Sequence, residues 1–204
     1  MSELSAKELL DYQNRVEKAV NDKQKMYFFN DNILKAMIIQ KGILGDGKED
    51  NMPDIVRMYC GQASLFIKTG KNMADNLKLQ YDISGLDTEE KNAWSLFNPW
   101  QNLKDALKAY ISKEKTLELI VDDIENLKDD KDLVEILSKD NVKIWHLPEP
   151  IGLNHFTTSK QSYRIEDSNT IKTATCGFND EENAKVFFDS FNVLKRFSVN
   201  VELS

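Results

Sequence analysis

Alternation of buried strands with amphipathic helices is the feature of this 204-residue sequence that most restricts its fold. Residues 55–60 (IVRMYC) and 116–121 (TLELIV) have the apolar, β-branched character of strands inside a sheet. Residues 100–113 lie between them and repeat apolar side chains at helical spacing, and a further strand is predicted at 142–147. Strands that alternate with helices favour an α/β domain, so we predict a mixed sheet flanked by helices.

A second pattern occupies residues 154–180 (NHFTTSKQSYRIEDSNTIKTATCGFND). It is typical of three short strands separated by polar turns, and we predict those strands at 153–158, 162–166 and 171–176. A capped helix with an acidic first turn is predicted to follow at 180–195.

The polar side chains of these strands fall on defined faces, because side chains alternate between the two sides of a strand. His155 and Thr157 share one face of the first strand. Ser162, Arg164 and Glu166 share one face of the second. Neighbouring strands of a hairpin bring such side chains together, so His155, Arg164 and Glu166 are expected to converge.

This stretch resembles the phospholipase D-like superfamily, whose members carry His-x-Lys-x4-Asp across a hairpin and an asparagine at the end of a later strand. His155 stands at the histidine position, but Thr157 replaces the lysine and Ser162 replaces the aspartate. Asn179, in the sequence GFND, stands near the family's asparagine and is expected to join the same site. The resemblance covers residues 115–197 and implies a single repeat with a degenerate motif.

In that family the histidine attacks phosphorus, and the lysine stabilises the negative charge that develops. The resemblance therefore makes His155 the candidate catalytic residue. Arg164 is the best replacement for the lysine, since its planar guanidinium suits phosphate, and Glu166 would orient His155 or pair with Arg164. A structural hairpin with an Arg–Glu pair on its surface is the alternative. The candidate ligand-binding residues are Thr157, Ser162, Arg164, Glu166 and Asn179.

Composition limits the classes of partner. A net charge of −7 argues against nonspecific nucleic-acid binding, which needs a basic surface, although local basic patches remain compatible with it. No apolar run approaches the ~18–20 residues of a membrane span, and the first residues are polar rather than typical of a signal peptide. Cys60 and Cys176 lack metal-binding spacing and are predicted to be reduced and buried. We expect a cytoplasmic protein without membrane association, metal or cofactor.

Three other motifs carry little functional weight. Residues 45–48 (GDGK) lack the spacing of a phosphate-binding loop. Asp122 and Asp123 follow a predicted strand, where carboxylates can hold Mg²⁺, but they open an acidic run typical of a solvated loop. Trp94 and Trp100 could stack on a nucleic-acid base, yet core packing is the more common role.

Residues 5–20 form an amphipathic helix that opens on a Ser-x-x-Glu capping box. This helix either packs on its own domain or pairs with its copy in a dimer. We predict an N-terminal helical segment at 1–24 and a phospholipase D-like α/β domain at 25–204, with 62–98 as a candidate insertion.

The replacements at the lysine and aspartate positions favour a catalytically degenerate domain that acts as a binding or regulatory module. Its partner would be a protein, a second copy, a nucleic acid or a phosphate ligand, and the resemblance implies a prokaryotic defence or mobile-element setting. A phosphodiesterase or nuclease that uses His155 as nucleophile and Arg164 in place of the lysine is the alternative. A structural interaction protein working through the N-terminal helix is a second alternative.

Overall fold

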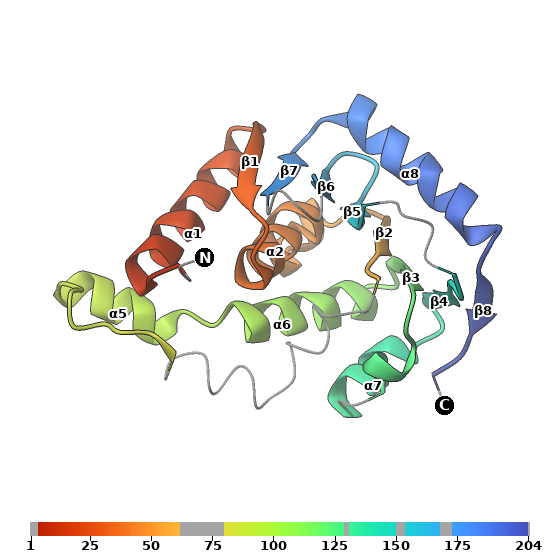
Figure 1. Cartoon of the computed structure of the whole chain (residues 1–204), viewed down its shortest axis with the longest axis horizontal. Helices are drawn as coiled ribbons and strands as arrows, with labels where there is room; N and C mark the ends of the chain where they lie inside the picture. The colour runs from red at the N-terminus through yellow and green to blue at the C-terminus, as the bar shows by residue number, and fades with distance from the viewer. Residues whose placement is uncertain (1–3, 62–79, 129–130, 150–153, 168–172, 204) are drawn as a thin grey trace.

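The computed structural model describes residues 4–61, 80–128, 131–149, 154–167 and 173–203 (Figure 1). These residues form an α/β domain in which a mixed eight-stranded sheet carries helices on both faces, so the predicted fold class is confirmed. The helices are α1 (Ala6–Asn21), α2 (Asn32–Ile38), α5 (Thr88–Leu96), α6 (Pro99–Ser112), α7 (Lys131–Leu137) and α8 (Glu181–Lys195). The strands are β1 (Lys25–Phe29), β2 (Ile55–Tyr59), β3 (Thr116–Val121), β4 (Val142–His146), β5 (Phe156–Thr158), β6 (Tyr163–Glu166), β7 (Thr173–Gly177) and β8 (Val199–Val201).

The sheet has the strand order β1-β7-β6-β5-β2-β3-β4-β8. β2, β3 and β4 are parallel to one another, whereas every other neighbouring pair is antiparallel. The α/β alternation therefore builds one half of the sheet and the short antiparallel strands build the other. The two halves join where β2 pairs with β5.

Helix ends follow the capping signals of the sequence. Ser5 accepts a hydrogen bond from the Glu8 N–H and opens α1, with the reciprocal bond completing the capping box. Asn98 caps α6 with Pro99 at its first position, and Asp180 caps α8. The predicted starts of α1 and α8 are confirmed, as are the strands and the helix predicted between residues 100 and 147.

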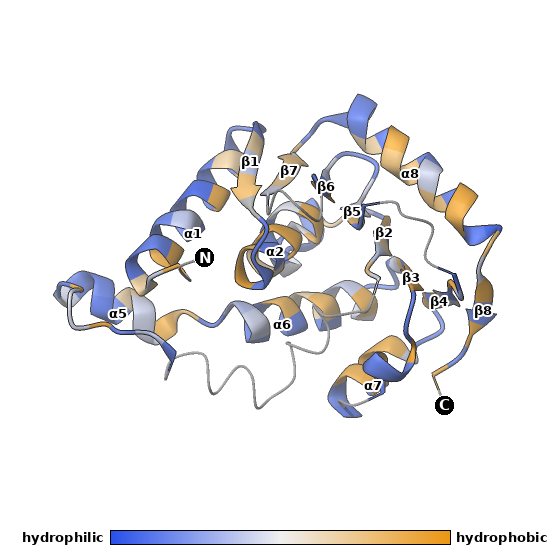
Figure 2. Ribbon diagram, in the orientation of Figure 1, coloured by the Kyte–Doolittle hydropathy of each residue, from blue (hydrophilic) through white to orange (hydrophobic). Residues whose placement is uncertain are grey.

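Helices cover both faces of the sheet (Figure 2), and the side chains of β2 alternate between these two faces. Val56 and Met58 join a large apolar cluster that includes residues of α1, α2, α6 and α7. Tyr59 joins a smaller cluster with residues of α8, and Arg57 donates to a backbone carbonyl of that helix. We refer below to the α2 face and the α8 face of the sheet.

The apolar side of α1 is covered by its own chain. Leu9 lies in the large cluster beside α2, and Val16 and Ala19 pack with the buried side chains of Phe28 and Cys176. Of the two arrangements open from sequence, the structure shows the helix packed on its own domain.

Parts of the predicted pattern lie outside the described residues. The first part of the candidate insertion at 62–98, residues 62–79, falls outside, and the starts of the strands predicted at 153–158 and 171–176 also fall outside. Within the described ranges, β5 begins at Phe156 and β7 at Thr173. The same ranges contain no helix that is long and apolar enough to cross a bilayer.

Candidate functional site

His155, Arg164 and Glu166 meet at one end of the β5–β6 hairpin, as predicted. The Glu166 N–H donates to the His155 carbonyl over 3.0 Å, which fixes the two residues opposite each other. Their side chains also meet, because His155 Nδ1 lies 3.5 Å from Glu166 Oε2. On the other carboxylate oxygen, Arg164 Nη1 lies 3.4 Å from Glu166 Oε1.

Two further residues come from the start of α2 and were not predicted as site residues. Lys35 Nζ donates to Glu166 Oε1 over 2.9 Å, and Arg164 Nη2 donates to Asn30 Oδ1 over 2.6 Å. Asp31 caps α2 by accepting from the Ile33 N–H, so Lys35 stands one turn into a helix whose end is fixed. We define His155, Arg164, Glu166, Lys35 and Asn30 as the His155 cluster.

Burial within the cluster is graded from the arginine to the histidine. Side-chain exposure is 1% for Arg164, 7% for Lys35, 13% for Glu166 and 32% for His155. His155 is therefore the member of the cluster that a molecule from solvent would meet first.

The groups around Glu166 favour its ionised carboxylate. Burial alone would raise its pKa, but contact with His155 and the charges of Lys35 and Arg164 outweigh burial and hold the pKa well below its usual range. The pKa of Lys35 is lowered, first by burial and then by the nearby charge of Arg164, with Glu166 opposing both. Two cations thus share one carboxylate.

Arg164 is incompletely satisfied by the described residues. Its Nε is buried and has no hydrogen-bond partner among them, although its terminal nitrogens contact Asn30 and Glu166. Buried donors are normally paired, so the unpaired Nε calls for an explanation, and a bound water or ion that accepts from it is one.

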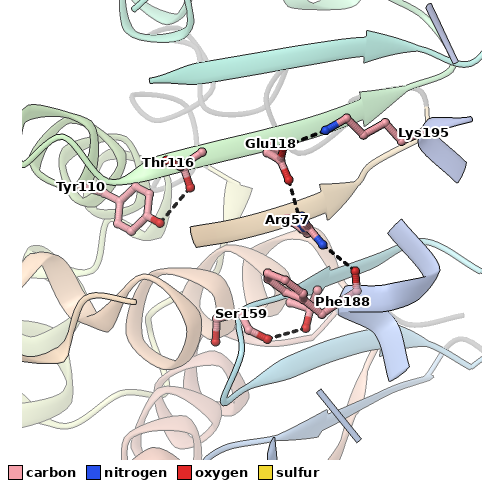
Figure 3. Close-up of polar contacts among 8 residues, drawn as sticks. Arg57, Tyr110, Thr116, Glu118, Ser159, Phe188 and Lys195 are labelled. Carbon is pink, nitrogen blue, oxygen red and sulfur yellow. Dashed lines mark hydrogen bonds and ion pairs between the residues drawn. The ribbon is translucent and has the colours of Figure 1, made fainter. Parts of the chain in front are cut away.

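A second buried arginine provides a contrast on the α8 face (Figure 3). Arg57 Nε donates to Glu118 over 2.7 Å and its Nη1 donates to the Phe188 carbonyl over 2.7 Å, while Lys195 donates to the same Glu118. Both cations also lie over aromatic rings, Arg57 at 3.8 Å from the Phe188 centroid and Lys195 at 3.9 Å from that of Trp145. Among the described residues, the cation–π contacts involve neither Lys35 nor Arg164.

The His155 ring also contacts residues at the carboxyl end of β2. The Tyr59 ring meets it edge-on with a centroid separation of 5.0 Å. A Cβ added to Gly61 would collide with His155 Nε2, so that nitrogen lies against the Gly61 backbone. Asp122 follows β3, and burial raises the pKa of its carboxyl while His155, Tyr59 and His146 oppose the increase.

The other predicted ligand-binding residues divide between two places. Thr157 is buried directly opposite Arg164, within the hairpin beside the cluster. Ser162 and Asn179 lie at the far end of β6 from His155, where the Asn179 N–H donates to Ser162 Oγ and both line a groove of about 620 Å³. The prediction that Asn179 converges with His155 is therefore wrong, because β7 runs antiparallel to β6 and ends beside Tyr163 rather than Glu166.

The remaining candidate residues have structural roles in the described parts of the chain. Asp123 accepts from the Glu125 N–H, and no group of three or more His, Cys, Asp or Glu within the described ranges is arranged to hold a metal ion. Trp94 and Trp100 are buried in the large apolar cluster, which corresponds to core packing. Both cysteines are free and buried, as predicted.

Comparison with known proteins does not place the chain in a family. No family model matches the sequence, and no curated protein matches it significantly. A solved structure similar to this fold is that of TrmBL2, described as an archaeal chromatin protein with a novel mode of DNA binding. The alignment covers 96% of this chain and 69% of that chain, with 10% identity and a TM-score of 0.49. A likeness at this level establishes neither family nor function.

Proposed function

We propose that this chain is a catalytically degenerate, phospholipase D-like binding module whose His155 cluster binds a phosphate-containing ligand. The observation that carries the proposal is the pairing of two buried cations, Lys35 and Arg164, with the single carboxylate of Glu166 beside a partly exposed histidine. An anion would pair with Arg164 and favour the protonated form of Lys35, whose pKa burial lowers, because buried charges are stable only when they are paired.

The chemistry of the donors fits a phosphate group. Arg164 offers an unpaired Nε–H, and guanidinium is well suited to phosphate oxygens. His155 stands between this buried charge and solvent, so its imidazole would be the outermost contact. A nucleotide, a nucleic-acid end and a free phosphate share this chemistry, and the biological setting in prokaryotic defence or mobile elements rests on the resemblance alone.

Phosphodiester hydrolysis is the second candidate, favoured by the contact between His155 Nδ1 and Glu166. In that reaction His155 Nε2 would bond to phosphorus, the ester P–O bond would break and the leaving oxygen would take a proton from water. The hydroxide formed would then attack phosphorus, break the P–N bond and release the imidazole. Binding is the better-supported function because Nε2, the nitrogen that would attack phosphorus, lies against the Gly61 backbone.

The two histidines make the binding proposal directly testable, since the sequence holds only His155 and His146. Imidazole NMR spectra of the full chain would be recorded while inorganic phosphate, a nucleotide and a short oligonucleotide are added separately. We expect saturable shifts of the His155 signals and little change at His146, whose Nε2 contacts the Asp122 carbonyl. His155→Gln and His146→Gln would assign the signals. Unchanged spectra, or equal shifts at both rings, would contradict the proposal.

The same two variants separate binding from catalysis. We expect no hydrolysis of bis-p-nitrophenyl phosphate or single-stranded DNA above background, with or without Mg²⁺. Turnover that is lost in His155→Gln and kept in His146→Gln would instead establish the hydrolase.

A further inference from the structure

The outer side of α8 carries an apolar stripe that the rest of the described chain leaves exposed. Val186, Val193 and Phe197 are 57%, 51% and 62% exposed. They are seven and four residues apart, so they lie along one side of the helix and its last turn. The opposite side of α8 is buried at Ala184, Phe191 and Leu194, and the last two pack on side chains of the sheet.

Three exposed charged residues beside this stripe are evenly spaced along the chain. Glu182 lies seven residues before Asp189 and Arg196 lies seven residues after it, and all three are exposed. Positions spaced by seven fall on the same side of a helix, so the three form a flank of acid, acid and base beside the valines. Val186 and Val193 lie three residues before Asp189 and four after it, so their midpoint is about half a residue beyond Asp189.

We propose that this face of α8 binds the same face of a second copy of the chain, antiparallel and with a twofold axis beside Asp189. A twofold contact requires a surface that is complementary to itself, and the spacing meets that requirement. Rotation about the axis brings Val186 against Val193 of the second copy, and Glu182 against Arg196 of the second copy. Asp189 meets Asp189 of the second copy at the axis. The repulsion between these two carboxylates opposes the contact, and its removal is a test specific to this arrangement.

The charge pattern favours a second copy over an unrelated protein. A different protein could bind this stripe whatever charges stand at its two ends, because that protein would supply the complementary groups itself. Opposite charges at equal distances from the midpoint are what an antiparallel copy of the same helix matches. This surface is on the α8 face of the sheet, whereas the His155 cluster is on the α2 face, so the proposal is independent of phosphate binding.

Sedimentation velocity of the full chain, from micromolar to hundreds of micromolar, tests the proposal. We expect reversible dimerisation that Val193→Glu weakens by at least about tenfold. Leu96→Glu is the matched control, since Leu96 is 82% exposed at the end of α5 and its variant should dimerise normally. Asp189→Asn removes the repulsion at the axis and should strengthen dimerisation by about twofold to fivefold.

A charge swap checks the orientation. Glu182→Arg and Arg196→Glu should each weaken the dimer, and the double variant should restore it because the pair is re-formed in the opposite sense. Far-UV circular dichroism would verify that each variant is folded, and Val186→Glu replaces Val193→Glu if the latter is not. A monomer at every concentration, a dimer unaffected by both valine variants, or a weaker dimer in Asp189→Asn would overturn the proposal.

Discussion

Glu166 is the residue on which the His155 cluster depends. Its two carboxylate oxygens contact Lys35, Arg164 and His155, and both cations are almost fully buried. Breaking a buried ion pair by removing one partner leaves an uncompensated charge, which costs more than the intact pair contributes.

We therefore predict that Glu166→Gln lowers the free energy of unfolding by about 3–5 kcal/mol, because it leaves Lys35 and Arg164 without a carboxylate. Urea denaturation would measure the change. Glu125→Gln is the control, since Glu125 forms an exposed pair with Lys128 and its loss should change stability by less than about 0.5 kcal/mol. A small effect of Glu166→Gln would show that the cluster is more hydrated than its burial indicates.

The lowered pKa of Glu166 also predicts how this stability changes with pH. A carboxyl whose pKa is lower in the folded state than in the unfolded state stabilises the fold above its ordinary pKa. That contribution is lost as the pH falls through the folded-state pKa. We therefore expect the difference in the free energy of unfolding between the wild type and Glu166→Gln to become smaller as the pH falls from about 7 to about 3. A difference independent of pH would be assigned to packing.

At the scale of elements, capping residues and period-two strands were predictable because their signals are local. The capping box of α1 and the alternation in β6 each lie within a few neighbouring residues. The same alternation also placed Arg164 and Glu166 on one face, where the structure has them.

The rest of the site depends on contacts that no local pattern encodes. Lys35 reaches Glu166 across 131 residues of sequence, and it lies in a helix whose apolar neighbours indicate only burial. Asn179 was misplaced for a related reason, since its position depends on the direction of β7 beside β6. Only the lysine's position inside an apolar helix could have marked it as a candidate, because a buried lysine requires a partner.

The cap of α2 should influence the site through Lys35. Asp31→Ala removes the acceptor for the Ile33 N–H and should cost about 1 kcal/mol, and it should also shift the His155 imidazole signals because Lys35 loses its fixed position. Asp87→Ala removes the equivalent cap of α5. That control should cost a similar amount in urea denaturation and leave the His155 signals unchanged. If the His155 signals were identical in both variants, the start of α2 would not determine the geometry of the His155 cluster.

At the scale of the whole molecule, the N-terminal helix and the sheet share one core. α1 contributes to two of the apolar clusters, one beside α2 and one beside β1 and β7. The predicted boundary after residue 24 therefore separates segments that cover each other's apolar surface.

We predict that a chain beginning at residue 25 is folded poorly or not at all. Burying a leucine or valine side chain contributes about 1.5–3 kcal/mol, so losing the contacts of Leu9 and Val16 removes much of a typical stability of about 5–15 kcal/mol. Circular dichroism and urea denaturation of the shortened chain would measure this. Stability equal to that of the full chain would show that residues 1–24 are a dispensable appendage.

The position of β1 at the edge of the sheet has a consequence for synthesis. β1 is the first strand of the chain, yet its pairing partner is β7, so its backbone groups stay unpaired until Thr173–Gly177 has left the ribosome. An unpaired strand can associate with other chains, and pairings between distant segments form slowly. Lys25–Phe29 is therefore exposed to competing partners while the intervening segments are synthesised, and this edge of the sheet forms only after β7 has been made.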